Sequence, residues 1–311
     1  MHTLIAEALA GSAQAVARLI SLVEAGDPDG AVVLRELHSR IGRAYVIGVT
    51  GPPGAGKSTL VDASTGVLRK QGRTVAVVAV DPTSPFTGGA LLGDRIRMQD
   101  HATDPGVFIR SMATRGSLGG LAPATADVVR ILDATGYEFI FIETVGTGQA
   151  EVDVVSVADT VAIVLVPGMG DTVQTMKAGI MEIGEVFIVN KADQGDPDRT
   201  AAEIRMMLQL NPHPTGWTVP VVKTVATSGQ GIEEALAAID AHRQYLSADG
   251  SLERRRKARR REEILRIVEA RTRMRAWELV HRSGRLEQLA DRVHAGEIDP
   301  YAAAEELLKQ T

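Results

Sequence analysis

Short apolar runs recur through the middle of the 311-residue chain, and they constrain its fold more than any other feature. Each run is too short for a buried helix and is rich in β-branched residues. The runs cover residues 45–49, 74–80, 139–142, 161–166 and 186–189, with a weaker one at 219–222. Segments of helical length separate them, which is typical of a parallel sheet covered by helices on both faces. The sequence therefore predicts a doubly wound α/β domain over residues 41–246.

The two ends of the chain carry helical patterns without strand signals. Five apolar residues near the start recur at roughly helical spacing and predict one amphipathic helix that ends near residues 26–27. They are Ile5, Leu9, Val16, Ile20 and Val23. A second short helix is expected over residues 30–40. Together these form an N-terminal helical extension, residues 1–40.

After residue 247 the pattern predicts one long charged helix and, beyond a break at residues 296–300, a last helix at 301–309. An apolar stripe at Ile264, Ile267, Val268 and Leu279 runs along the long helix. A stripe of this kind needs a partner surface, which is either the remainder of the same chain or a second copy of it. Residues 247–311 are therefore expected to form a C-terminal helical extension.

Composition excludes several classes of site. The chain contains no cysteine, so it can form neither a disulfide nor a thiolate metal site. This is compatible with the cytoplasm. Its net charge of -5 argues against nucleic acid or a membrane surface as the default partner. The first residues do not resemble a signal peptide, since Glu7 and Arg18 interrupt the apolar positions.

A glycine-rich loop follows the first strand-like run. It reads Gly51, Pro52, Pro53, Gly54, Ala55, Gly56, Lys57, Ser58, and Thr59 follows it at the start of a helical pattern. This matches G-x-x-x-x-G-K-[ST] between a strand and a helix, the context that a phosphate-binding P-loop requires. Backbone N–H groups and the helix N-terminus would bind phosphates. Lys57 is expected to reach the β- and γ-phosphates, and Ser58 to bind Mg²⁺.

Acidic residues at the ends of two other runs are candidates for the metal site and for catalysis. Glu143 ends the run at 139–142, where it would act on Mg²⁺ through water, and Gly146 would offer its N–H to the γ-phosphate. Asp81 and Asp94 would support Mg²⁺ or orient the attacking water. The alternative is that Glu143 caps the next turn and that both aspartates are ordinary turn residues.

The sequence Asn190, Lys191, Ala192, Asp193 follows another run and indicates a guanine site. A carboxylate has two acceptors that match the N1–H and N2–H₂ donors of guanine, whereas adenine lacks this pair of donors. Asp193 would therefore select GTP over ATP. The stem of Lys191 would cover the base, and Asn190 would brace the loop. Downstream, Val225, Ala226 and Thr227 would present a backbone N–H to guanine O6.

With these motifs in place, the chain resembles the MeaB/ArgK family of GTPases, the methylmalonyl-CoA mutase-associated G proteins. The resemblance rests on residues 49–59, 80–84, 88–95, 112–120, 143–149, 190–193 and 296–304. The segments at 112–120 and 296–304 are not generic to GTPases, so the match is specific. Glu143, unusual for GTPases in general, is normal in this family.

The resemblance implies a P-loop fold of the signal-recognition/MinD-like class, GTP/GDP and Mg²⁺ as ligands, and a homodimer formed by the C-terminal helices. It also implies a chaperone role in which the nucleotide gates adenosylcobalamin loading and protects or reactivates methylmalonyl-CoA mutase. Alternatives of the same fold class are a GTPase for metallocentre insertion and one for nucleic-acid or membrane targeting. The first alternative would need metal ligands of the cysteine type, and this chain has no cysteine. The only feature for the second is the basic run at 254–261, which acids flank, as on a solvated or intersubunit helix face.

Overall fold

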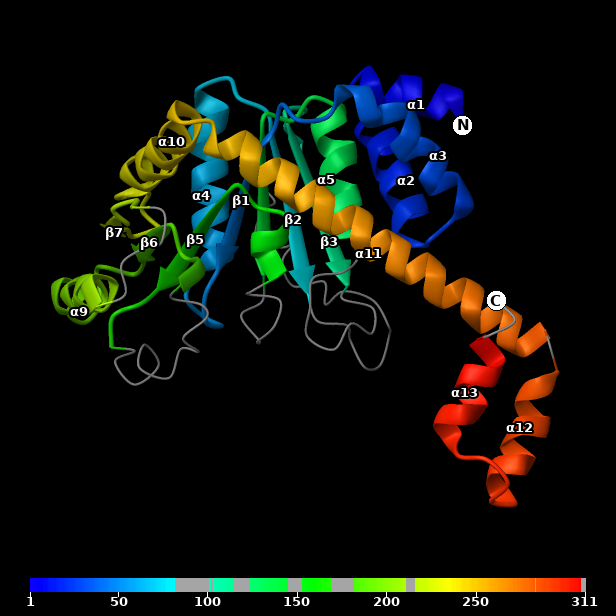
Figure 1. Cartoon of the computed structure of the whole chain (residues 1–311). Coiled ribbons are helices and arrows are strands. Elements are labelled where there is room, and N and C mark those ends of the chain that lie inside the picture. Colours follow the sequence, from blue (N-terminus) through cyan, green and yellow to red (C-terminus); the bar gives the residue numbers. More distant parts are fainter. Residues whose placement is uncertain are drawn as a thin grey trace. The chain divides into compact units, whose positions relative to one another are not determined.

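The computed structural model (Figure 1) describes residues 1–81, 101, 103–113, 124–144, 153–168, 182–210, 216–282 and 284–308. The chain divides into two compact units, Met1–Leu252 and Glu253–Thr311. Each unit has its own internal packing and is described by itself. Within the described ranges, no helix is both long enough and apolar enough to cross a membrane.

A seven-stranded parallel sheet forms the centre of the first unit, as the apolar runs predict. Its strands are β1 (Tyr45–Thr50), β2 (Val75–Asp81), β3 (Val107–Ala113), β4 (Phe139–Thr144), β5 (Thr160–Leu165), β6 (Val186–Val189) and β7 (Val221–Lys223). They lie in the order β3-β2-β4-β1-β5-β6-β7. The predicted α/β fold is confirmed, and β1, which precedes the glycine-rich loop, lies at the middle of the sheet.

Strand β3 was not predicted from the sequence. Among the described strands it pairs with β2 alone, at the edge of the sheet, and its sequence is less continuously apolar than that of the central strands. Arg110 interrupts the apolar residues, and its guanidinium forms an ion pair with Glu24 on a neighbouring helix. A charged residue in the run concealed the strand.

Helices cover both faces of the sheet (Figure 1). Helices α4 (Lys57–Lys70) and α10 (Ile232–Ala248) contribute to one apolar core, while α2 (Ala13–Glu24), α3 (Pro28–Leu37), α5 (Thr125–Ala134) and α9 (Pro197–Leu210) contribute to the other. Side chains along β1 alternate between the two cores: Val46 belongs to one, and Ile47 and Val49 to the other. The sheet is therefore doubly wound.

The prediction of one long N-terminal helix is wrong, because two helices occupy that stretch. Helix α1 (His2–Leu9) ends before Gly11, whose φ of +93° does not continue a helix. Ser12 then caps α2, its Oγ accepting a hydrogen bond from the N–H of Ala15 at 3.3 Å. The second expected helix is present as α3, followed by a 3₁₀ turn at His38–Arg40.

Two aspartates fix the start of β1, the strand that leads into the glycine-rich loop. On α5, Asp133 accepts hydrogen bonds from the N–H groups of Arg43 and Ala44 at 3.0 and 2.8 Å. Just before β5, Asp159 accepts from Val46 N at 3.1 Å and donates its own N–H to Val46 O at 2.7 Å. The entry to β1 is thus held from both sides.

The second unit consists of helices. The predicted long charged helix is present as α11 (Ser251–Arg282) but ends earlier than expected, and α13 (Pro300–Leu308) confirms the last short helix. Between them lies α12 (Arg285–His294), which was not predicted. Glu306 of α13 joins the last two helices through ion pairs with Arg285 and Arg292 of α12 at 2.7 and 3.2 Å.

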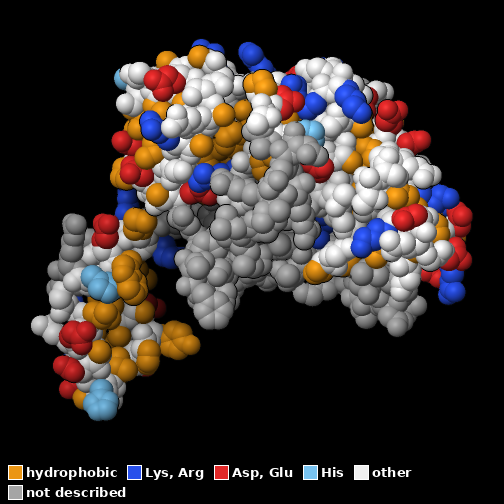
Figure 2. Space-filling model, turned by 180° about the vertical axis from the view of Figure 1, so that it is seen from behind, with side chains coloured by type: hydrophobic (Ala, Val, Ile, Leu, Met, Phe, Trp, Pro, Cys, Tyr) orange, Lys and Arg blue, Asp and Glu red, His pale blue; other side chains and the backbone are white. Residues whose placement is uncertain are grey.

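Large apolar side chains remain on the surface of this second unit (Figure 2). On α11 they are Ile264, Leu265, Ile267, Val268, Met274 and Trp277. Single exposed apolar residues are normal, but Ile264, Ile267 and Val268 share one side of the helix, and such a group is characteristic of a binding surface.

Candidate nucleotide site

The candidate site lies where the central strands end. Because all seven strands are parallel, the carboxyl ends of β1, β4, β5 and β6 meet at one edge of the sheet. After β1 the chain forms β2, β3 and β4, which all lie on one side of β1 in the sheet. It then crosses to the other side of β1 and forms β5. In open α/β sheets, ligands bind at such a change of direction, outside the carboxyl ends of the strands.

The glycine-rich loop between β1 and α4 has a backbone that only glycine permits. Gly51, Gly54 and Gly56 have φ values of +138°, +77° and +85°. A Cβ at Gly51 would lie 2.1 Å from the carbonyl oxygen of Val164 in β5, and one at Gly56 would lie 2.4 Å from the Nδ2 atom of Asn190. Conformation and space both require glycine at these two positions. Pro52, Pro53 and Ala55 complete the loop.

Helix α4 begins with Lys57 and Ser58, both of which are buried. The Nζ atom of Lys57 donates hydrogen bonds to the carbonyl oxygens of Gly51 and Pro52, at 2.9 and 3.0 Å. The ammonium group therefore turns back over the loop, where it adds positive charge to that of the helix N-terminus. Thr59, in the first turn, is partly buried.

Glu143 lies beside this helix start. Its Oε1 atom accepts a hydrogen bond of 2.6 Å from the Oγ of Ser58, and both side chains are buried. The structure therefore brings together two residues, 85 positions apart, that the sequence suggested for Mg²⁺. Next to them, Thr144 of β4 donates to Thr50 of β1 through their hydroxyl groups, at 2.8 Å. This threonine pair was not anticipated, although both strands end in threonine.

The side-chain amide of Asn190 connects three loops at the same edge. Its Nδ2 donates to the carbonyl oxygen of Ala55 in the glycine-rich loop at 2.9 Å. Its Oδ1 accepts from the N–H of Ala226 and from the hydroxyl of Thr224, both at 3.1 Å. Asn190 is 2% exposed, so these bonds are shielded from water. An aspartate at this position would lack the donor, and a leucine would lack both groups.

The remaining residues of the predicted base site surround this amide. Lys191 has a φ of +54°, an unusual conformation for a residue other than glycine that is often found at functional sites. Asp193, two residues further on, is exposed. Val225 N donates to Gln230 O at 2.9 Å and Ala226 N donates to Asn190 Oδ1 at 3.1 Å, so both N–H groups already have acceptors. Of the three downstream residues, Thr227 has the exposed N–H without an acceptor among the described residues.

Three predicted residues are not placed with the others. Asp81 is the last residue of β2, and the structure does not describe its side chain. Asp94 and Gly146 lie outside the described residues. In the parts of the chain that are described, no group of three or more His, Asp or Glu residues could hold a metal ion.

Comparison with known proteins agrees with this geometry. Residues 16–280 match the family model described as methylmalonyl Co-A mutase-associated GTPase MeaB. The chain belongs to the MeaB family. This confirms the resemblance seen in the sequence, and it makes the chain a member of a family of GTPases.

Relatives match along most of their length. A protein of Pyrococcus abyssi named as a GTPase is 52% identical, covering 96% of this chain and 93% of the relative. The GTPase ArgK of Escherichia coli is 36% identical over 78% of this chain and 76% of its own. A mitochondrial protein of Caenorhabditis elegans named methylmalonic aciduria type A homolog is 31% identical, covering 97% and 80%.

A solved structure shares the fold of this MeaB-family chain. The crystal structure of an LAO/AO transport system kinase superposes with a TM-score of 0.72 at 25% identity. The match covers 100% of this chain and 97% of that one.

The Asn190 amide leads to a prediction about stability. Asn190→Ala leaves the buried carbonyl of Ala55 and the N–H of Ala226 without their partner, which typically costs about 1–3 kcal/mol per group. We expect the free energy of unfolding to fall by about 2–4 kcal/mol, measured by urea denaturation without nucleotide. Gln194→Ala, at an exposed side chain nearby, is the control and should change stability by less than about 0.5 kcal/mol. Equal stability of the two variants would show that the amide does not hold the loops.

Proposed function

We propose that this MeaB-family chain is a GTP-hydrolysing chaperone of adenosylcobalamin-dependent methylmalonyl-CoA mutase. In this role its nucleotide state gates cofactor loading, and the chain protects or reactivates the mutase. The observation that carries the nucleotide part is the Asn190 amide, which joins the glycine-rich loop to the loop at Ala226. The family description supports the mutase part. We place this activity in the cytoplasm.

The phosphates of GTP would bind at the glycine-rich loop. Lys57 already has hydrogen bonds to loop carbonyls, and phosphate oxygens of higher charge can replace them as acceptors. Its charge, together with the N-terminus of α4, would stabilise negative charge on the β- and γ-phosphates. In hydrolysis, charge spreads over the γ-phosphoryl oxygens in the transition state, so the same groups would speed the reaction.

The oxygen atoms beside the glycine-rich loop are suitable ligands for Mg²⁺. This hard cation prefers oxygen ligands, and Ser58 and Glu143 offer a hydroxyl and a carboxylate already in contact. We assign Ser58 as a ligand and Glu143 as an acid that acts through water, with Asp81 and Asp94 as supporting groups. When bound, the ion would neutralise charge on the phosphates. Glu143 also holds the Ser58 hydroxyl, which keeps this oxygen in place.

Guanine would bind over Lys191, with its N1–H and N2–H₂ donors on the carboxylate of Asp193. Asp193 is exposed, so it is accessible to a base. The left-handed backbone of Lys191 lies between the buried brace Asn190 and Asp193. The loop at 225–227 would approach guanine O6, and Thr227 has the N–H that is not already bonded within the loop.

The base assignment predicts an altered specificity. Asp193→Asn replaces one acceptor with an NH₂ donor, which faces a guanine donor. Affinity for GTP should fall by at least about tenfold, and affinity for xanthosine triphosphate, which has a carbonyl at that place, should rise. Fluorescent-nucleotide titration would measure both. ATP is the control, since both proteins should bind it weakly. Equal binding of ATP and GTP by the wild type would contradict the assignment.

Two other roles of this fold class are less consistent with the residues. A metallocentre-insertion GTPase would need metal ligands, but the chain has no cysteine and its described part has no His/Asp/Glu cluster. A nucleic-acid or membrane-targeting GTPase would need a basic surface. The basic run on α11 is flanked by Glu253, Glu262 and Glu263, and the net charge is -5.

The proposed partner predicts a change in the rate of GTP hydrolysis. We expect slow GTP hydrolysis by the chain alone and a marked acceleration when the adenosylcobalamin-dependent mutase is added, measured as phosphate release. An arginine supplied by a partner or by a rearranged loop typically contributes about 10³–10⁵ in rate. Lys57→Ala is the control, because it should stay inactive with the mutase while remaining folded. Fast hydrolysis alone, with no response to the mutase, would refute the partner role.

We also propose that the C-terminal helices form a homodimer. Ile264, Ile267 and Val268 are 62%, 47% and 54% exposed on α11 and lie within about one turn of each other. The same stripe of a second chain, related by a two-fold axis, would bury them. The basic side chains around the stripe would remain at the rim, where charged groups are tolerated.

The proposed interface predicts that charged substitutions in the apolar stripe lower the molecular mass from that of a dimer to that of a monomer. The double variant Ile264→Glu and Val268→Glu should be monomeric, because it places carboxylates in the apolar stripe, and it should still bind GTP. Ala270→Glu, at another exposed position of α11, adds the same kind of charge away from the stripe and should remain dimeric. Light scattering would measure both. A monomeric wild type, or a dimeric double variant, would place the interface elsewhere.

A further inference from the structure

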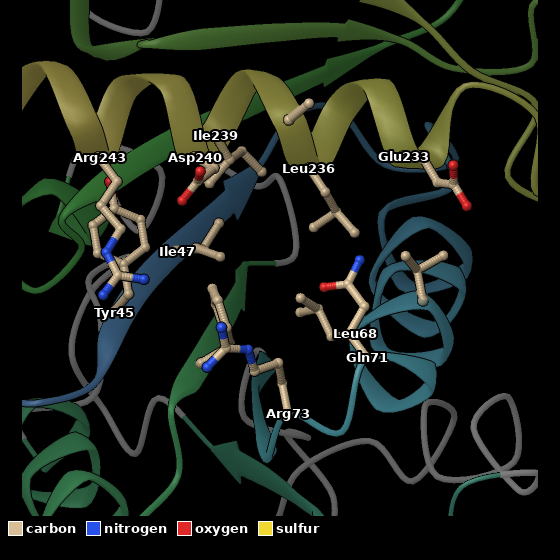
Figure 3. Close-up of a pocket in the computed structure, with 13 residues that line it drawn as sticks. Tyr45, Ile47, Leu68, Gln71, Arg73, Glu233, Leu236, Ile239, Asp240 and Arg243 are labelled. Carbon is tan, nitrogen blue, oxygen red and sulfur yellow. The ribbon is translucent and has the colours of Figure 1, made fainter.

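A cavity of about 400 Å³ lies in the first unit, away from the glycine-rich loop. It is bounded by the start of β1, the carboxyl-terminal end of α4 and one side of α10 (Figure 3). Tyr45 is the first residue of β1, so the cavity lies toward the amino end of the sheet, whereas the nucleotide loops lie at the carboxyl end. No part of the proposed GTPase chemistry uses it.

Part of the cavity wall is apolar. Ile47, Leu68, Leu236 and Ile239 form this part, and they come from β1, α4 and α10 (Figure 3). The volume lies within the usual range for ligand pockets, about 300–1,000 Å³. Such pockets combine a largely apolar lining with a few polar groups that orient the ligand.

The polar group that decides the ligand's charge is Arg243. Its guanidinium lies over the ring of Tyr45, 5.0 Å from the centroid, and 6.0 Å from the ring centroid of Phe139. Stacking on two rings holds the planar group while leaving its N–H edges able to bind an oxyanion. Among the described residues, Arg243 forms no ion pair with a carboxylate. Its charge acts on Glu138 without a salt bridge between the two groups, so its N–H groups remain available to an oxyanion.

The other charged residues of the lining disfavour a ligand with several negative charges. Arg73 also lines the cavity, but it forms a 2.8 Å ion pair with Glu138. Glu233 and Asp240 are exposed on α10 at the rim and would repel a polyanion such as a nucleotide. The Gln71 amide points toward the middle of the cavity and offers both a donor and an acceptor (Figure 3).

We propose that this cavity is a binding site for a small amphipathic organic monoanion. Its flat apolar body would lie between α4 and α10, and its single acidic group would bind the guanidinium of Arg243. The Gln71 amide would hydrogen-bond to a polar atom of the body.

The position of the cavity couples this site to the nucleotide loops. Helix α4 begins at Lys57 and Ser58, and α10 begins directly after the loop that contains Ala226. A Cβ at Gly231, the N-cap of α10, would lie 2.1 Å from the carbonyl oxygen of Lys223, so this helix start is tightly packed against the segment leading to that loop. The cavity lies between the carboxyl-terminal end of α4 and the side of α10 that begins at Glu233, so a ligand there would act on the separation of the two helices and, through it, on both loops. By linkage, nucleotide and ligand then change each other's affinity by the same factor.

The probe for this site is anilinonaphthalene sulfonate, an aromatic monoanion whose fluorescence rises in apolar surroundings. The full-length protein should bind it with a saturable component. Ala237→Trp, at an exposed position that lines the cavity, should remove that component by filling the space. Ala241→Trp, one turn further along α10 at an exposed position outside the lining, is the matched control and should retain it. Comparison of the two variants also distinguishes probe bound in the cavity from probe bound to apolar residues elsewhere on the surface.

Charge and coupling are tested with the same probe. Arg243→Gln should weaken binding of anilinonaphthalene sulfonate about tenfold and leave neutral phenylnaphthylamine unchanged. The anion should also change the affinity for GDP by about fivefold in the wild type and not in Ala237→Trp. Equal probe binding by both tryptophan variants would overturn the site, and equal loss of both probes in Arg243→Gln would overturn the preference for an anion. An unchanged GDP affinity would overturn the coupling. Circular dichroism would verify that each variant is folded.

Discussion

The side-chain amide of Asn190 holds together segments that are far apart in the sequence. Its donor binds the glycine-rich loop after β1, and its acceptor binds the loop after β7, while its own backbone follows β6. The bonds lie in a buried place, where a missing partner is costly because water cannot replace it. The phosphate loop and the loop at Ala226 are therefore held at a set distance before any nucleotide arrives. Such preorganisation reduces the ordering cost of binding.

The order of the strands makes this bond possible. Because β1 lies between β4 and β5, its loop is bordered on one side by Glu143 and on the other by Val164 and Asn190. The close approach of Val164 and Asn190 explains why a side chain is not tolerated at Gly51 or Gly56. The two helices on this face begin at the nucleotide loops and extend toward the amino end of the sheet, where Arg243 and the apolar cavity lie. Each helix thus links the candidate site to a second place where a ligand fits.

The second unit is stabilised differently from the first. Helix α11 is strongly charged and has little apolar surface to bury, yet six of the large apolar side chains it carries are exposed. A long helix of this kind gains stability from packing against another surface more than from its own hydrogen bonds. Ion pairs between α12 and α13 hold the end of the unit together without a large core. This division of the chain matches a proposed division of labour between a nucleotide-binding unit and an assembly unit.

The sequence by itself determined the parallel sheet, the glycine-rich loop, the predicted guanine motif and the family, because these depend on local patterns. A buried parallel strand must be continuously apolar, and a loop that wraps phosphates must contain glycine at set spacings. Edge strand β3 and the break at Gly11 were missed, because an interrupting arginine and a single glycine are weak local signals. Only the tertiary structure decided that Ser58 contacts Glu143, that Asn190 joins two loops, and that Arg243 stacks on Tyr45 beside a cavity. These contacts join residues from different strands and helices, and their distances depend on strand order and helix packing, which a local pattern does not encode.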